Sequence, residues 1–186
     1  VHAGVQPDLA YGAVMPPLYL SSTFAFQDIC TNAGYDYTRS GNPTRAALEE
    51  AIALLEGGHG ATCTSTGMSA ILVALNLLPQ GGHLISTVDC YGGTFRLLEH
   101  ARKSYGLEVT YLDLADLAAL KSALRPNTRM IWIETPSNPL LRLTDIAAVA
   151  EIGHRQPDCL VAVDNTFLSP YLQRPFDLGA DLVIHS

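Results

Sequence analysis

Two apolar runs near the end of the chain each finish on polar residues. Residues 160–163 lead into Asp164, with Thr166 close behind, and residues 182–184 lead into His185 and Ser186. A buried parallel strand has this pattern, with its first polar group at the carboxyl end. Ligands of open α/β sheets bind outside that end. We therefore interpret Asp164 as a candidate ligand contact and expect Ser186 at the same edge of the sheet.

The segment Ser65-Thr66-Gly67-Met68 joins a predicted strand to a predicted helix. The first N–H groups of a helix are free, and glycine lets a phosphate approach them closely. Gly67 and Met68 therefore suit a phosphate site, although Ser65 or Thr66 acting only as a helix cap is the alternative. The segment has neither GxGxxG nor the lysine of a Walker loop, so it matches no dinucleotide or P-loop motif.

Tyr37 and Arg39 stand on alternate residues of a segment rich in turn residues. In an extended chain both side chains point to one side. A guanidinium fork and a phenol hydroxyl can clamp a phosphate together. The alternative is a solvated arm, in which such residues are commonly exposed.

Two further junctions carry groups that suit a flat ligand. In Asp89-Cys90-Tyr91-Gly92-Gly93, the glycines allow a tight turn that would present the Tyr91 ring at the sheet edge for stacking. The alternative is an interface tyrosine. In the segment ETPSNP, two prolines stiffen a loop that holds the amide of Asn138. Stiff proline loops also serve purely structural purposes.

Composition excludes several classes of function. A net charge of -7 and scattered basic residues predict neither nucleic-acid binding nor a membrane-binding patch. The six His residues form no metal-ligand pattern, and no GxSxG supports a hydrolase. Four widely spaced cysteines, no secretory leader and no long apolar span indicate reduced thiols in the cytoplasm.

These residues need a sheet that brings their loops to one edge. The pattern predicts strands at residues 61–64, 83–87, 108–112, 130–133, 160–163 and 182–184, and helices at 44–56, 67–78, 94–105, 116–124 and 145–155. Strands spaced by helices of this length form right-handed crossovers in a mainly parallel sheet. The predicted fold class is α/β.

Two domains or parts of domains are expected. Residues 1–43 are predicted to form an extended arm that packs on a neighbouring subunit, and residues 44–186 to form the sheet domain. The helix at 44–56 should bury Leu48, Ala51, Ile52 and Leu55, whereas the nearly uncharged helix at 67–78 should be buried on all sides. A mean hydropathy of +0.17 predicts an oligomer. Because a domain seldom ends on a buried strand, we expect a truncated copy of a longer protein.

Seven ordered blocks of the chain together resemble the Cys/Met-metabolism family of pyridoxal-phosphate enzymes. They are PPLYLSSTF, YDYTRSGNPT, STGMSA, DCYGGTFRL, ETPSNPLL, VDNTFLSP and LGADLVIHS. The resemblance implies the large domain of the aspartate-aminotransferase-like fold, with pyridoxal phosphate (PLP) as cofactor. Within the family the pattern is most similar to the cystathionine γ-synthase branch.

The resemblance also implies roles for the site residues. Asp164 would pair with the pyridine nitrogen and Tyr91 would stack on the ring, and these are the implied catalytic residues. The other implied cofactor contacts are Gly67, Met68 and Ser186 at the phosphate, Tyr37 and Arg39 at the same phosphate from a neighbouring subunit, Asn138 at the ring hydroxyl, and Thr166 beside Asp164. Arg96 and Asp36 are implied on the substrate side. The shared site implies a dimer within a homotetramer.

In the family, the lysine that binds the cofactor follows the His-Ser pair by three residues. This chain carries Lys103 and Lys121 but ends at Ser186. The resemblance therefore implies an inactive chain that lacks that lysine and the following small domain, and a parent that makes cystathionine from an O-acylhomoserine and cysteine. Alternatives are a cystathionine γ- or β-lyase, an O-acylhomoserine sulfhydrylase, a non-catalytic phosphate-binding or oligomerisation module, and a nucleotide-binding domain.

Overall fold

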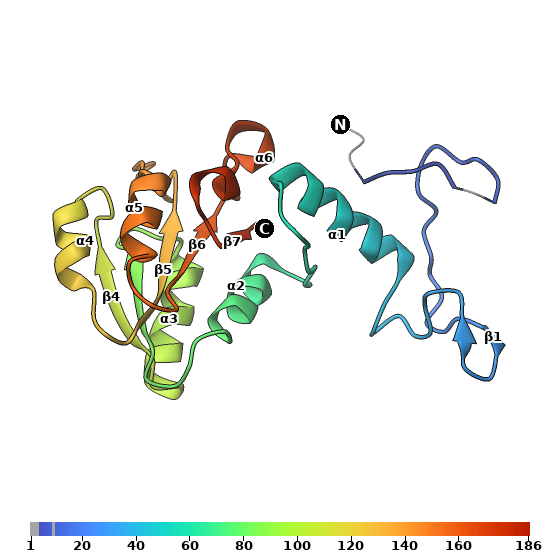
Figure 1. Cartoon of the computed structure of the whole chain (residues 1–186), viewed down its shortest axis with the longest axis horizontal. Helices are drawn as coiled ribbons and strands as arrows, with labels where there is room; N and C mark the ends of the chain where they lie inside the picture. Colours follow the sequence, from blue (N-terminus) through green and yellow to red (C-terminus); the bar gives the residue numbers. More distant parts are fainter. Residues whose placement is uncertain (1–3, 9) are drawn as a thin grey trace. The chain divides into compact units, whose positions relative to one another are not determined.

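The computed structural model describes residues 4–8 and 10–186, so residues 1–3 and 9 of the predicted arm lie outside the described part. The chain divides into two compact units, residues 1–63 and 64–186, which follow one another along the colour bar of Figure 1. Helix α1 (Pro43–Glu56) belongs to the first unit, whereas the sequence pattern grouped it with the sheet.

The first unit contains an antiparallel hairpin, β1 (Phe26–Asp28) with β2 (Thr31–Asn32), which the sequence did not predict. Asn42 caps α1 by accepting the N–H of Thr44, and Gly57 ends the helix at φ 76°. The helix itself is confirmed. Its predicted buried face is wrong, since Leu48 is 54% exposed while Ala53 and Glu56 are the buried positions. Periodicity locates an apolar stripe but does not say what covers it.

The second unit is an α/β domain around a five-stranded, all-parallel sheet in the order β4-β3-β5-β6-β7. Its strands are β3 (His83–Thr87), β4 (Glu108–Leu112), β5 (Thr128–Glu134), β6 (Leu160–Asp164) and β7 (Leu182–Ile184). Its helices are α2 (Gly67–Leu75), α3 (Gly92–Ser104), α4 (Leu117–Ala123), α5 (Ile146–Gly153) and α6 (Ser169–Leu172), with a 3-10 turn, η1 (Pro175–Leu178). The predicted fold class is confirmed.

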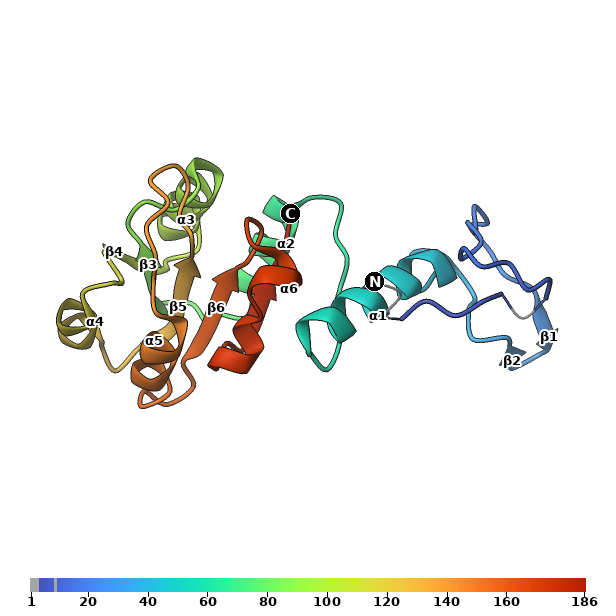
Figure 2. The ribbon, with the colours of Figure 1, turned by 90° about the horizontal axis from the view of Figure 1, so that it is seen from above.

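Helices cover both faces of this sheet. Figure 2 shows α3 on one side and α4 and α5 on the other. One core cluster joins α4 and α5 to the sheet through residues such as Leu120, Val149 and Ile131. The other joins α2 and α3 to it through Leu98 and the fully buried Trp132. Because all five strands are parallel, their carboxyl ends meet at one edge.

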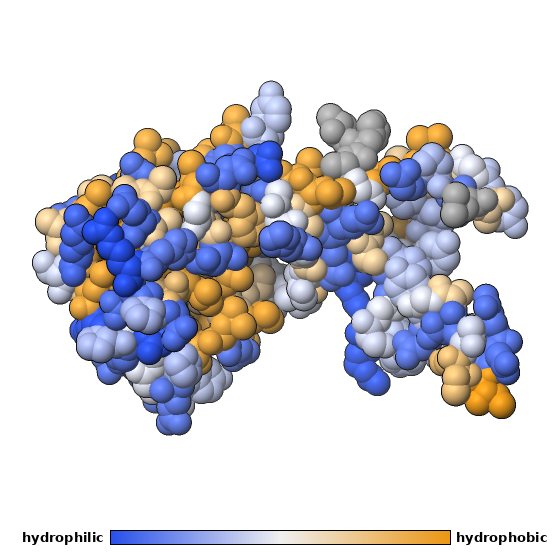
Figure 3. All heavy atoms as spheres, in the orientation of Figure 1, coloured by the Kyte–Doolittle hydropathy of each residue, from blue (hydrophilic) through white to orange (hydrophobic). Residues whose placement is uncertain are grey.

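Two predictions for residues 61–78 are wrong. Residues 61–64 form no strand, and the N–H of Cys63 donates to the Glu49 carboxylate (2.9 Å) instead of a sheet partner. Helix α2 ends at Leu75 and is not buried on all sides, since Leu72 is 37% and Val73 50% exposed. Figure 3 shows hydrophobic residues gathered where Figure 1 labels α2. A strand requires a hydrogen-bonded neighbouring strand, and a buried helix requires other elements packed on every face. Both depend on residues that are distant in the sequence.

The sheet also holds a buried histidine at its amino end. In His83, Nδ1 lies 2.8 Å from Thr128 Oγ1 and Nε2 lies 2.9 Å from Thr110 Oγ1, which links three neighbouring strands. Burial, and then the charge of Arg125, lowers the pKa of His83 below its ordinary 6.5. A depressed folded-state pKa contributes stability above that ordinary value, and this stability is lost as the pH falls through the folded-state pKa.

We therefore expect His83→Gln to flatten the acid side of the stability profile. The melting temperature of the original protein should fall between about pH 7.5 and about pH 5, and that of the variant should fall less, because no imidazole must be protonated in the core. His100→Gln, at an exposed position of α3, is the control. Parallel profiles for His83→Gln and the original protein would contradict the expectation.

Candidate active site

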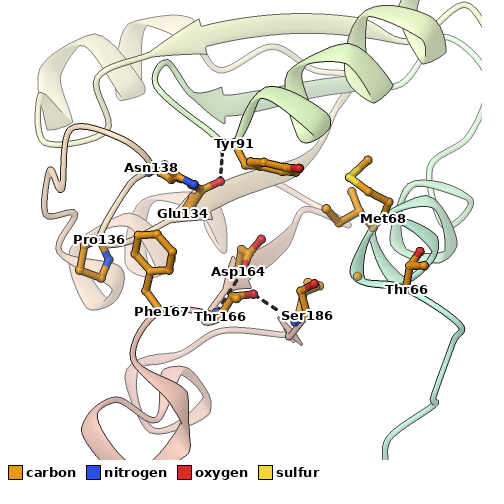
Figure 4. Close-up of a pocket in the computed structure, with 13 residues that line it drawn as sticks. Thr66, Met68, Tyr91, Glu134, Pro136, Asn138, Asp164, Thr166, Phe167 and Ser186 are labelled. Atoms are coloured by element: carbon orange, nitrogen blue, oxygen red, sulfur yellow. Dashed lines mark hydrogen bonds between the residues drawn. The ribbon is translucent and has the colours of Figure 1, made fainter.

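A cavity of about 250 Å³ opens at the carboxyl edge of the sheet, within the unit of residues 64–186. Figure 4 shows its side chains converging from loops that are far apart in the sequence. The sequence-predicted residues that line it are Gly67, Met68, Tyr91, Asn138, Asp164, Thr166 and Ser186. Parallel strands bring these loops together because every strand ends at the same edge.

The amino end of α2 forms one wall. Thr66 caps the helix by accepting the N–H of Ser69 (3.1 Å). The cap does not use the N–H groups of Gly67 and Met68, which precede the first intrahelical donor, Ala70. These two donors and the positive helix end are available for an anion. The Thr66 cap therefore leaves these two N–H groups free of intrahelical partners.

Hydrogen bonds join the residues that follow β6 and β7 into a second wall of the cavity. Thr166 N donates to Asp164 Oδ1 (3.1 Å), and Ser186 N donates to Thr166 Oγ1 (3.1 Å). Asn165 N donates to the carbonyl of Ile184 (2.9 Å), which extends the pairing of the two strands. The Thr166 N–H uses only Oδ1 of the Asp164 carboxylate, and Asp164 lines the cavity.

Glu134, the last residue of β5, is a cavity residue that the sequence reasoning missed. Its carboxylate accepts the N–H of Tyr91 (2.7 Å) and the N–H of Asn138 (2.9 Å). Burial raises the pKa of Glu134, the two N–H donors oppose that rise, and Asp164 and Asp89 add to it. The rule that selected Asp164, an acid at the carboxyl end of an apolar strand, also selects Glu134, which is its register partner on the neighbouring strand.

Four apolar residues also line the cavity without having been predicted: Ile71, Pro136, Phe167 and Ile184. They are apolar residues in or beside segments that the sequence had singled out for polar groups. Their role comes only from their position around the cavity, and the local sequence pattern does not predict that position.

The remaining predicted site residues do not line this cavity. Arg96 is exposed on α3. Tyr37, Arg39 and Asp36 belong to the first unit. There the predicted extended geometry is wrong, because residues 38–40 form a turn in which the Arg39 guanidinium lies 5.0 Å from the Tyr37 ring centroid. The Asp36 carboxylate accepts the hydroxyl of Ser40 and the N–H of Tyr37, and these bonds lower its pKa.

A family model described as "Cys/Met metabolism PLP-dependent enzyme" matches residues 1–186. The chain belongs to this family. The resemblance seen in the sequence blocks is thereby confirmed, and so is pyridoxal phosphate as the family's cofactor.

Individual relatives carry both synthase and lyase names. The chain is 44% identical to a probable cystathionine gamma-synthase of Herpetosiphon aurantiacus, covering all of this chain and 58% of that protein. It is 47% identical to cystathionine beta-lyase MetC of Bacillus subtilis (strain 168), covering all of this chain and 47% of that protein. The chain thus spans about half the length of these relatives.

Among solved structures, it matches a cystathionine gamma synthase from Xanthomonas oryzae pv. oryzae in complex with aminoacrylate and cysteine. The TM-score is 0.95 and the identity 50%, covering all of this chain and 48% of that one. A cystathionine gamma-lyase from Lactobacillus plantarum, complexed with L-serine, matches with a TM-score of 0.94 and 46% identity, at 100% and 48% coverage. The fold of the chain is therefore that of the PLP-dependent cystathionine synthases and lyases.

The residues of the cavity fit this cofactor. A carboxylate, a tyrosine ring and a helix amino end are the groups that a protonated pyridine nitrogen, an aromatic face and a phosphate require. The close approach of Gly67 to Ser186 supports the fit, since a Cβ on Gly67 would lie 2.5 Å from the Ser186 hydroxyl oxygen and fill the space between them.

Within the described residues, no group of three or more His, Cys, Asp or Glu is arranged to hold a metal ion. In that same part of the chain, none of the helices combines the length and the apolar character needed to cross a membrane.

Gly67→Ala is expected to weaken cofactor binding. The new Cβ would also lie 2.5 Å from Ser186 Cβ and 3.0 Å from its Cα, so the end of β7 must move away from the helix. If the N–H groups of Gly67 and Met68 bind the phosphate, the dissociation constant for PLP should rise about tenfold or more, because charge-assisted hydrogen bonds to the phosphate would be lost. Absorbance titration of the whole protein with PLP measures this. Gly60→Ala is the control, since a Cβ there meets nothing within 4 Å; equal constants for the two variants would contradict the expectation.

Proposed function

We propose that the whole protein makes cystathionine from an O-acylhomoserine and cysteine by PLP-dependent replacement at the γ carbon. The observation that carries the proposal is the 50% identity, over the entire chain, with a cystathionine gamma synthase whose structure contains aminoacrylate and cysteine. The cavity at the carboxyl edge supports it, because it gathers the groups that bind and orient the cofactor.

When bound, PLP supplies an electron sink for the carbanion formed at the α carbon of an amino-acid substrate. Asp164 keeps the ring nitrogen protonated by pairing with it, and this charge makes the ring a better acceptor. Tyr91 covers one face of the ring, and its hydroxyl exchanges a proton with the substrate. Asn138 contacts the ring hydroxyl, and Thr166 supports the Asp164 carboxylate through the hydrogen bond described above.

Gly67 N–H, Met68 N–H and the Ser186 hydroxyl hold the phosphate in this proposal. Tyr37 and Arg39 from a second copy of the chain complete that site, while Asp36 and Arg96 lie on the substrate side. The stacked Tyr37–Arg39 pair supports this role because it holds the guanidinium in one orientation.

A homo-oligomer, a dimer that shares active sites within a tetramer, follows from that assignment. Exposed large apolar residues in the segments that follow β5 and β6 support it: Leu140, Leu141, Leu143, Phe167, Tyr171 and Leu172. The cytoplasm is the proposed location, supported by free cysteines at positions 30, 63, 90 and 159.

Steady-state assays of the whole protein test the proposed reaction. We expect cystathionine to form from cysteine and an O-acylhomoserine, with release of the carboxylic acid. Cleavage of cystathionine without any acylhomoserine-dependent synthesis would replace the synthase assignment with a lyase. Sulfide in place of cysteine as the preferred nucleophile would indicate a sulfhydrylase.

A lyase is the second candidate, and the 47% identity with the Bacillus subtilis beta-lyase favours it specifically. The cavity residues provide the same cofactor contacts for both reactions. A non-catalytic module differs from both, because it would show no PLP absorbance at all.

The 186 residues alone are proposed to be inactive. Lys103 and Lys121, on α3 and α4, are exposed, and the cavity lining contains no lysine. An amine within reach of the cofactor is needed for covalent attachment. Borohydride reduction of the 186-residue chain with PLP should trap no cavity adduct, and a stoichiometric adduct in the cavity would overturn this part of the proposal.

A further inference from the structure

The Glu134 carboxylate connects two loops that come from different parts of the chain. Oε2 accepts the N–H of Tyr91, in the loop between β3 and α3. Oε1 accepts the N–H of Asn138, in the loop between β5 and α5. The residue is only 6% exposed. Figure 4 shows the carboxylate between these two loops, with the Tyr91 ring above the cavity.

The Glu134 carboxylate contacts the residue at the amino end of helix α3. Tyr91 is the cap residue of α3 and makes no side-chain capping hydrogen bond. Glu134 therefore brings an acceptor from another strand to the backbone that begins the helix, and its negative charge also faces the positive end of the helix dipole. The backbone position of Tyr91 is thus set by β5 as well as by its own loop.

Both carboxylate oxygens act as acceptors for backbone donors, so the geometry suits a deprotonated acid. An amide of the same shape offers one acceptor and one donor, and its donor would face an N–H group. Replacing this acid by glutamine therefore leaves one of the two loops unsatisfied. Asp164, the register partner on β6, faces the cavity at the same level of the sheet.

We propose that Glu134 is a positioning residue that holds Tyr91 and Asn138 at their places around the cofactor ring. The inference rests on the proposed placement of PLP between Tyr91 and Asp164. Glu134 acts through the two backbone N–H groups and takes no proton from the substrate. Its loss should change the orientation of the bound ring more than the stability of the fold.

Glu134→Gln in the whole protein tests this role by PLP titration and by visible circular dichroism of the bound cofactor. We expect the dissociation constant for PLP to rise about 10- to 100-fold, the range typical for residues that orient direct ligands. The visible dichroic band should weaken or shift, because the ring's environment changes. An unchanged constant together with an unchanged band would overturn the proposal.

Asp181→Asn is the matched control. Asp181 Oδ2 accepts the N–H of Val161 (2.7 Å) at the amino end of β6, so it is also a carboxylate bound to strand backbone, away from the cavity. We expect this variant to lower the melting temperature without changing the dichroic band. If both variants lower PLP affinity equally, Glu134 acts only through general stability and the proposal is wrong.

A double-mutant cycle with Tyr91→Ala separates this inference from the proposed function. Since part of the Glu134 effect passes through the Tyr91 ring, Glu134→Gln should cost less affinity in the Tyr91→Ala background. If the effects of the two substitutions on PLP affinity were fully additive, Glu134 would not act through Tyr91 and the proposed coupling would be wrong. If Tyr91→Ala alone weakens PLP binding but Glu134→Gln does not, only this inference fails; if neither weakens it, the placement of the cofactor fails as well.

Discussion

Asp164→Asn should lower kcat/KM of the whole protein for its amino-acid substrate by about 100- to 1,000-fold, the loss typical when one preorganised electrostatic contact is removed. The amide keeps the shape of the side chain, and its oxygen can still accept the N–H of Thr166. It loses the negative charge that, in the proposed function, keeps the pyridine nitrogen protonated. The effect should therefore fall on kcat rather than on folding. Steady-state kinetics measures the change in kcat/KM, and the visible spectrum of bound PLP reports whether the ring is still bound in the same environment.

Asp145→Asn is a matched control for this substitution. Asp145 caps α5 by accepting the N–H of Ala148 (3.0 Å), and asparagine caps a helix as well as aspartate does. This variant should keep its activity. An Asp164→Asn protein with full PLP occupancy and unchanged kcat/KM would show that the carboxylate does not partner the ring nitrogen.

Trp132→Ala should have the largest effect on stability, lowering the free energy of unfolding by about 3–5 kcal/mol. Trp132 is fully buried in the middle of β5, in the cluster beneath α2 and α3. Removing the ring leaves a cavity between the sheet and the helices, one of which carries Gly67 and Met68. Urea unfolding followed by far-UV circular dichroism measures the loss, because Trp132 is the single tryptophan and its fluorescence disappears with it.

Trp132→Phe distinguishes the contribution of the packed ring of Trp132 from that of its polar Nε1–H group. In the described part of the chain, the buried Nε1 of Trp132 has no hydrogen-bond partner, so phenylalanine removes an unsatisfied donor along with part of the ring. We expect it to cost less than about 1.5 kcal/mol. If Trp132→Ala and Trp132→Phe lowered the free energy of unfolding equally, the volume that the indole ring fills would not explain its contribution to stability.

Much of the second unit could be predicted locally. The strands at residues 83–87, 108–112 and 182–184 are confirmed at their predicted bounds, and helix caps such as Asp116 and Asp145 lie at the predicted helix starts. Apolar runs, caps and turn residues act over a few positions, so a single sequence carries them. The seven motif blocks also identified the family, which the whole-chain match confirms.

Long-range relations account for the errors. Residues 61–64 have a strand-like composition but no ladder partner, and the apolar face of α1 is partly exposed. In the Tyr37–Arg39 segment a turn replaces the predicted extended chain. Each outcome depends on what lies across from a segment in space, and periodicity contains no information about that.

At the site, the sequence by itself determined which groups were available: an acid at the end of β6, a glycine at the start of α2, and an aromatic ring before α3. Only the tertiary structure decided how Glu134 is used. Its two acceptor oxygens meet N–H donors of Tyr91 and Asn138, which are 43 and 4 residues away along the chain. A parallel sheet brings such loops to one edge, and this contact between them exists only once the strands have paired.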